Sequence, residues 1–153
     1  MKYLQFLKDH PTADSFTNKG ISDAEIRHLE ELYNNSRSFP VALKELLSLA
    51  GNFCHALDYN IYDSQEELQT EEREELKDLY DLTIERPFFF IDLVSYGLPV
   101  FVFLDEGDDP PVNQMVNNPT KEKYYERVGG TLQSYVISRI RYYQKWYPDH
   151  KKN

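Results

Sequence analysis

Apolar residues recur every three to four positions near the start of the chain, which is typical of helices that bury one face. We expect a short docked helix over residues 1–8 and a longer one that begins after Ser22. Ser22 can cap this second helix, and Glu25, three residues further on, completes a capping box. The apolar face of the second helix is expected to consist of Ile26, Leu29, Leu32 and Tyr33.

Two further helices follow from the same periodicity. Pro40 suits the first turn of one of them, and Gly51 is expected to end it in the left-handed conformation. Its inner face would hold Leu43, Leu46, Leu47 and Ala50. Ser64 can cap the other helix, which is long and rich in acidic residues. The residues expected to face inward from it are Leu68, Leu76, Leu79 and Leu82.

Strands are predicted where apolar residues alternate or form aromatic runs. Residues 56–62 alternate in the manner of a half-buried strand. Residues 87–96 and 98–104 are rich in aromatic and β-branched side chains and flank Gly97, so we expect an antiparallel pair at the centre of the sheet. A further short strand is indicated over residues 112–116.

The last part of the chain predicts a loop and a closing helix. Pro119 and the glycine pair at residues 129–130 are expected to bracket a loop around the tyrosines at 124–125. Thr131 can cap a helix that Pro148 ends. The apolar stripe of that helix would consist of Leu132, Val136, Ile140 and Tyr143.

The order of these elements predicts an α+β fold. A chain of 153 residues is about the length of one domain, and 41% hydrophobic residues suffice for a core. We expect a mainly antiparallel sheet of about four to six strands, with the N- and C-terminal helices packed on one face.

Charge and composition narrow the function classes. The 26 acidic residues against 17 Lys and Arg give a formal charge of −9, which argues against nucleic acid as a partner and favours a basic protein. The single cysteine, Cys54, allows no internal disulfide, which suggests a reducing compartment. Because no run of about 18 apolar residues and no signal-peptide pattern occurs, we expect a cytoplasmic protein that does not enter the membrane.

Four carboxylates follow the second aromatic strand directly and raise the question of a metal site. Oxygen-rich loops can hold hard cations, but the ligand order of an EF-hand fails here, because its second ligand falls on Gly107 and its closing Glu on Val116. We therefore expect an acidic loop without a metal. The four residues are Asp105, Glu106, Asp108 and Asp109.

The acidic helix has a larger charge imbalance than solubility requires. Residues 63–81 hold nine acids and two basic residues, whereas residues 120–153 hold eight basic residues and three acids. A solvated helix explains the presence of charge, but interleaved Lys and Glu would serve solubility equally well. We expect this helix and the acidic loop to form a surface that recognises a basic partner. The candidate residues on the helix are Glu71, Glu72, Glu74 and Glu75.

The sequence offers little for catalysis. Cys54 and His55 are the only adjacent nucleophile–base pair, and neighbours on a strand would point to opposite faces. Asp92, set between apolar residues, is the best candidate for a perturbed acid, although an outward position or a local hydrogen bond explains it too. No phosphate- or dinucleotide-binding motif is present, so we expect no cofactor and no enzymatic activity.

Three ordered motifs carry a resemblance to a known family. One lies in the helix pair, one is the run Asp109-Pro110-Pro111-Val112 after the aromatic strands, and one is TLQSYVISRI at residues 131–140. Over residues 21–140 they resemble the SUKH superfamily of Smi/Knr-like proteins, which includes eukaryotic cell-wall-assembly regulators and many bacterial immunity proteins. The helix-pair residues that carry the resemblance are Ile21, Glu30, Phe39, Pro40, Leu46, Leu47 and Gly51.

The resemblance implies a function in binding. A SUKH-like immunity protein would neutralise a cognate toxin, and an acidic surface suits a basic toxin such as a nuclease. Two alternatives stay open at this point. One is an intracellular regulatory or scaffold domain, and the other is a metal-dependent hydrolase that uses the acidic loop.

Overall fold

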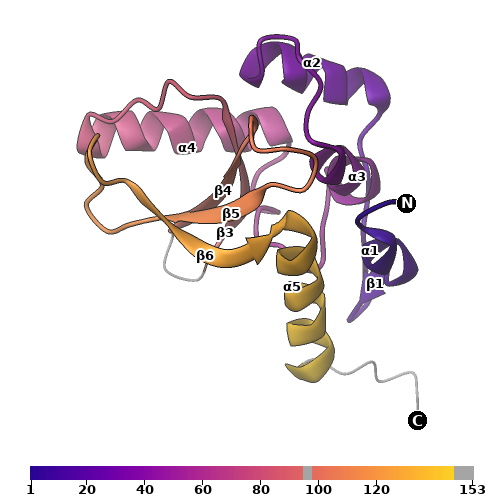
Figure 1. Cartoon of the computed structure of the whole chain (residues 1–153). Helices are drawn as coiled ribbons and strands as arrows, with labels where there is room; N and C mark the ends of the chain where they lie inside the picture. Colours follow the sequence, from indigo (N-terminus) through magenta and orange to yellow (C-terminus); the bar gives the residue numbers. More distant parts are fainter. Residues whose placement is uncertain (95–97, 147–153) are drawn as a thin grey trace.

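The computed structural model describes residues 1–94 and 98–146 and has the α+β fold that the sequence predicts (Figure 1). No helix in these two ranges is both long and apolar enough to cross a membrane. The elements in chain order are α1 (Gln5–Asp9), β1 (Thr12–Ala13), β2 (Phe16–Thr17), α2 (Asp23–Tyr33), α3 (Val41–Ala50), α4 (Gln65–Tyr80), β3 (Phe88–Leu93), β4 (Pro99–Phe103), β5 (Pro111–Met115), β6 (Tyr125–Thr131) and α5 (Leu132–Trp146).

Helices α2 and α3 begin where the sequence signals place them. The Ser22 side chain accepts a hydrogen bond from the Glu25 N–H at 3.1 Å, which confirms Ser22 as the cap of α2. The buried Glu30 side chain accepts a hydrogen bond from the Phe39 N–H at 2.6 Å and so ties the end of α2 to the start of α3. Leu32, which we expected on the inner face of α2, is largely exposed.

Gly51 follows the end of α3, but not in the left-handed conformation that we expected. Its φ is −63°, in the right-handed region. A Cβ at this position would lie 2.7 Å from the Leu47 carbonyl oxygen and 3.0 Å from a side-chain carbon of Ile21. Glycine is therefore required here for close packing and not for its freedom of rotation.

The main sheet has four antiparallel strands in the order β3-β4-β5-β6. The predicted central pair is confirmed, with Phe89 opposite Val102, and the predicted turn residue Gly97 lies outside the described residues. Strand β5 confirms the short strand expected after the acidic loop. A bulge between Phe90 and Asp92 shifts the register of β3 against β4.

Strand β6 occupies the region that we expected to be a loop. It pairs with β5 although Gly129 and Gly130 lie within it, at φ values of 83° and 74°. Its residues are exposed or half-buried, so the apolar alternation that marks a strand in a sequence is missing. Strand β6 leads directly into α5, whose predicted end at Pro148 lies outside the described residues. The residues of α5 that face the core are Leu132, Val136 and Ile140.

Residues 56–62 are irregular, which makes the predicted strand wrong. Tyr59 is buried and its hydroxyl donates a hydrogen bond to the Ala50 carbonyl at 2.6 Å. The Asn60 side chain donates to two backbone carbonyls of the same region, so side chains satisfy backbone groups that a ladder would otherwise pair. Ile61, which continued the alternation, is 75% exposed.

Strands β3 and β4 are buried on both faces of the sheet. One face packs against α1, α2, α3 and α5, which confirms that helices from both ends of the chain share one face. The other face is covered by the C-terminal half of α4 and the segment 82–86. Figure 1 shows α4 apart from α1 and α5, and its first residue, Gln65, donates a hydrogen bond to the Gly51 carbonyl at the end of α3. The second face is largely aromatic and holds Phe88, Phe90, Phe101, Phe103 and Met115, with Leu76 and Leu82 packed on it.

We expect Leu46→Ala to lower the free energy of unfolding by roughly 2–5 kcal/mol, because Leu46 is almost completely buried in the larger core. Trp146→Ala is the control, since Trp146 lies at the end of α5 with 60% of its surface exposed. Denaturant melts of both variants provide the measurement. A neutral effect of Leu46→Ala would contradict the packing of α3 described above.

Candidate protein-binding surface

Helix α4 carries one of the two predicted acidic segments, and its own side chains define its ends. The Ser64 hydroxyl accepts a hydrogen bond from the Glu67 N–H at 3.0 Å, and Glu66 adds a second negative charge to the first turn. The helix ends at Asp81, which has the left-handed φ of 52°. The Asp81 carboxylate accepts a hydrogen bond from Lys77 at 2.5 Å.

The inner face of α4 covers the open edge of strand β3. This strand is the first in the sheet, so one of its edges has no neighbouring strand. The Gln69 amide donates to the Phe90 carbonyl at 2.9 Å, and its side-chain oxygen accepts from the Phe90 N–H at 2.9 Å. Arg73 donates to the Phe88 carbonyl at 2.7 Å. These bonds replace a strand partner and fix α4 on the edge of the sheet.

The positive charge of Arg73 lies on the inner face of α4, over two aromatic rings. Its guanidinium lies 3.9 Å from the centre of the Phe88 ring and 4.6 Å from that of Tyr33. Burial lowers the pKa of Arg73 to about 10, so it stays protonated at neutral pH. Arg73 is one of the two basic residues in the acidic segment, and the other, Lys77, is paired with Asp81. Neither compensates the acids on the outer face.

The outer face of α4 presents unpaired carboxylates beside apolar side chains. Leu79 is 62% exposed, contrary to our expectation that it faces inward, and its neighbour Tyr80 is 40% exposed. We call this surface the outer face of α4, and its carboxylates are Glu71, Glu74, Glu75 and Asp78. Within the described residues these four carboxylates have no ion pair or hydrogen bond.

Glu72 does not belong to that surface, although the sequence placed it there. Its side chain is buried and accepts a hydrogen bond from the Tyr62 hydroxyl at 2.8 Å. Desolvation raises the pKa of the Glu72 carboxyl, and the nearby charges of Glu75 and Glu71 raise it further. Glu72 therefore contributes to the attachment of α4 and not to its outer face.

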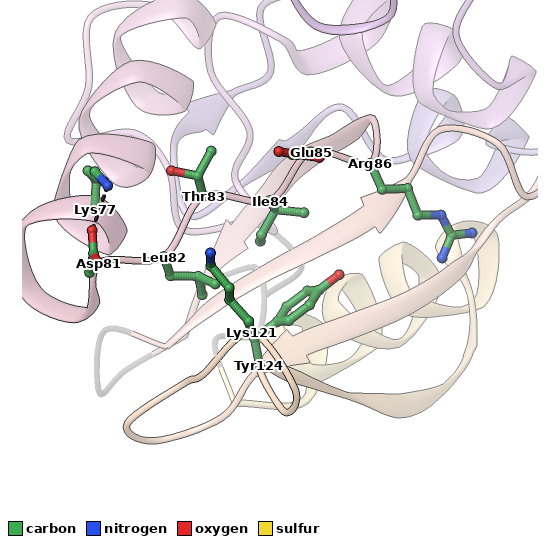
Figure 2. A pocket seen from close by; sticks show the side chains of 9 residues that line it. All are labelled: Lys77, Asp81, Leu82, Thr83, Ile84, Glu85, Arg86, Lys121 and Tyr124. Carbon is green, nitrogen blue, oxygen red and sulfur yellow. Dashed lines mark hydrogen bonds and ion pairs between the residues drawn. The ribbon is translucent and has the colours of Figure 1, made fainter.

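A hollow opens beside the C-terminal end of α4 (Figure 2). It has a volume of about 370 Å³ and is bounded by Lys77 and Asp81, by the segment 82–86, and by Lys121 and Tyr124 from the loop before β6. Figure 2 shows Lys121 and Tyr124 projecting from across the hollow toward that segment. A second hollow of about 220 Å³ lies between α4 and the same segment. The surface around the end of α4 is therefore concave as well as charged.

The first two acids of the loop are neutralised within the molecule. Arg86 donates to both oxygens of Asp105, at distances of 2.7 and 3.0 Å. Arg127 holds Glu106 in the same two-pronged way, at 3.0 and 2.7 Å. The hydrogen bond from Arg86 lowers the pKa of Asp105. These two carboxylates connect the loop to the segment before β3 and to β6.

The last two acids of the loop meet the starts of two helices. The Asp108 carbonyl accepts a hydrogen bond from the Ala42 N–H in the first turn of α3 at 2.9 Å. The Asp109 carboxylate accepts one from the Gln133 N–H in the first turn of α5 at 2.9 Å. The loop is therefore a joint between the sheet and two helices, and only the Asp108 side chain is exposed without a partner in the described residues.

The candidate catalytic residues Cys54 and His55 have surroundings that are typical of residues with a structural role. Burial raises the pKa of the Cys54 thiol to about 11, which disfavours the reactive thiolate. The His55 Nε2 atom lies 2.7 Å from the His10 carbonyl oxygen, which can only accept, so Nε2 donates its proton to that carbonyl. Within the described residues the thiol and the imidazole form no hydrogen bond with each other.

Asp92 is a buried structural carboxylate. It accepts hydrogen bonds from the Leu93 N–H at 2.9 Å, the Asp58 N–H at 2.6 Å and the Tyr135 hydroxyl at 2.5 Å. Arg139 lies 4.0 Å away. The local hydrogen bond that we offered to explain Asp92 is therefore present, and the carboxylate also joins β3 to the preceding irregular segment and to α5.

The structure does not bring the two acidic segments together around a metal. Among residues 1–94 and 98–146, no group of three or more His, Cys, Asp or Glu side chains could hold a metal ion.

A comparison with models of protein families finds no match to the chain, and neither does a comparison with curated proteins.

We expect Gln69→Ala to lower the free energy of unfolding by roughly 2–5 kcal/mol. The change leaves the buried N–H and carbonyl of Phe90 without partners, and each such group costs about 1–3 kcal/mol. Glu74→Ala, on the outer face of the same helix, is the matched control with little expected change. Equal melting midpoints for the two variants would disprove the edge-pairing role.

We expect Glu72→Gln to stabilise the protein at pH 7. Because folding raises the pKa of Glu72, ionisation weakens the folded state as pH rises through that pKa, and glutamine removes this loss while keeping an acceptor for Tyr62. The gain should vanish below about pH 4, where glutamate is protonated in the unfolded chain as well. Unfolding free energies at both pH values give the test, and a loss of stability at pH 7 would contradict it.

Proposed function

We propose that this chain is a non-enzymatic binding protein whose outer face of α4 recognises a basic protein partner. The observation that carries the proposal is the contrast between the two acidic segments. The loop acids at 105, 106 and 109 have cations or helix N–H groups as partners, whereas the carboxylates of the outer face have none in the described residues. A basic partner would supply the missing cations.

The apolar and concave features around the same helix support a protein as the partner. Interfaces gain most of their affinity from a few buried aromatic or aliphatic anchors, with charge that sets orientation and encounter rate. Leu79 and Tyr80 are exposed next to the acids, and the hollow at 82–86 offers a place for a partner side chain. A merely solvated helix would need neither feature.

The resemblance to the SUKH superfamily suggests the biological role. An immunity protein of that kind acts in the cytoplasm and neutralises a cognate toxin by covering its active site or an adjacent surface. Nuclease toxins need a basic face for phosphates, so a helix with four unpaired carboxylates suits them as a substitute for nucleic acid. The proposed partner is therefore a basic toxin, which the acidic helix keeps from its substrate by charge mimicry.

The test is the rate of association with the partner across a salt series. The partner is isolated by affinity capture from the native cell, and binding is followed by stopped flow. Replacing Glu71, Glu74 and Glu75 by Gln should slow association on the order of tenfold at low salt, since these charges attract the partner over a Debye length of about 8 Å or more. Wild-type binding should lose that advantage as salt rises.

A variant of equal net charge provides the control. Asp23→Asn, Glu31→Gln and Glu126→Gln change three exposed acids outside α4 and should leave most of the wild-type rate intact. If both triple variants bind at the same rate, the outer face of α4 has no special role. If the captured protein is acidic, or if its activity persists in the complex, the proposed toxin neutralisation is wrong.

A further inference from the structure

A third hollow lies away from α4. It has a volume of about 350 Å³ and lies between the turn that joins β1 to β2, the segment 53–60 and helix α5. None of its lining residues comes from α4 or the acidic loop, so it is separate from the surface proposed above. Its chemistry is defined by two carboxylates and three aromatic rings: Asp14, Asp58, Phe16, Phe53 and Tyr143.

One aromatic side chain of this pocket, Phe16, is exposed and is not part of either core cluster. Phe16 has 59% of its surface exposed and stacks on Phe53, with ring centres 5.8 Å apart and an interplanar angle of 23°. The two residues before Phe16, Asp14 and Ser15, have positive φ values of 47° and 70°, which form the tight turn of the hairpin. The hairpin thus holds an aromatic ring at the rim of the pocket.

The polar part of the pocket offers acceptors and negative charge. The carboxylates of Asp14 and Asp58 are exposed and have no ion pair in the described residues, and no Lys or Arg lines the pocket. The backbone of Asp58 is fixed by hydrogen bonds with Asp92 and Leu93. Arg139, the cation of this region, lies 4.0 Å from Asp92 and against the Tyr143 ring.

His55 also lines the pocket, and one of its ring nitrogens is buried. Its Nε2 atom lies 2.7 Å from the His10 carbonyl, which only accepts, so the neutral ring carries its proton on Nε2 and leaves Nδ1 as an acceptor. Nδ1 is buried and has no partner in the described residues. The pocket therefore combines ring faces with two anionic groups, which suits a flat, cationic ligand with several N–H donors.

We propose that this pocket binds the guanidinium group of an arginine side chain from a protein partner. A guanidinium is planar, stacks on aromatic rings and presents five N–H donors, whereas an ammonium is a compact, strongly hydrated point charge. Asp14 and Asp58 supply the opposite charge, and Phe16 with Phe53 supplies the stacking surface. This proposal is independent of the function assigned to the outer face of α4.

The experiment is an NMR titration of the ¹⁵N-labelled chain with N-acetyl-arginine amide. We expect millimolar binding, typical of a single side chain, with chemical-shift changes concentrated in residues 13–16 and 53–60 and at Tyr143. N-acetyl-citrulline amide has nearly the same shape without the charge and should bind at least about fivefold more weakly. The lysine analogue should also bind more weakly, because it stacks poorly.

Two variants separate the contributions of charge and stacking. Asp58→Asn and Phe16→Ala change exposed side chains and should each weaken binding of the arginine probe by about threefold or more, whereas the control Glu126→Gln should not change it. The absence of localised shifts at saturating probe, or equal binding of the citrulline or lysine analogue, would overturn the proposal. So would retention of full affinity in both pocket variants.

Discussion

Strand β3 is buried on both faces and open along one edge, and the arrangement of the other elements depends on how that edge is closed. Unpaired backbone groups away from water cost free energy, so a partner is required. The side chain of Gln69 supplies both a donor and an acceptor to Phe90, and Arg73 supplies a donor to Phe88. A helix, and not a fifth strand, therefore completes this side of the sheet.

This attachment also gives the two faces of α4 different surroundings. The inner face uses polar side chains for backbone pairing, and it draws Arg73 inward over the ring of Phe88. The outer face is left with an excess of negative charge. The acidic loop between β4 and β5 differs. Arg86 and Arg127 compensate the charges of Asp105 and Glu106, while the Asp108 carbonyl and the Asp109 carboxylate accept hydrogen bonds from the first turns of α3 and α5. Two segments that are both rich in acidic residues therefore differ: most acids of the loop have partners within the protein, and those on the outer face of α4 have none in the described residues.

The helices were predictable because capping and periodicity act over a few residues, as at Ser22 and Ser64. Strand β6 was missed because its pairing with β5, and not an apolar pattern, makes it a strand. The role of the loop acids was hidden for a related reason. Arg86 and Arg127 are 19 and 21 residues from their carboxylate partners in sequence, and no local pattern connects them. The pairing of Gln69 with β3 likewise has no sequence signal.

Carboxyl footprinting of the native complex tests the central claim, that the outer face of α4 contacts the partner. A carbodiimide labels exposed Asp and Glu side chains, and mass spectrometry compares their labelling in the free and the bound protein. We predict that Glu71, Glu74, Glu75 and Asp78 lose most of their labelling on binding, while Glu31 and Glu126 keep theirs. Unchanged labelling of the four α4 carboxylates in the complex would contradict it.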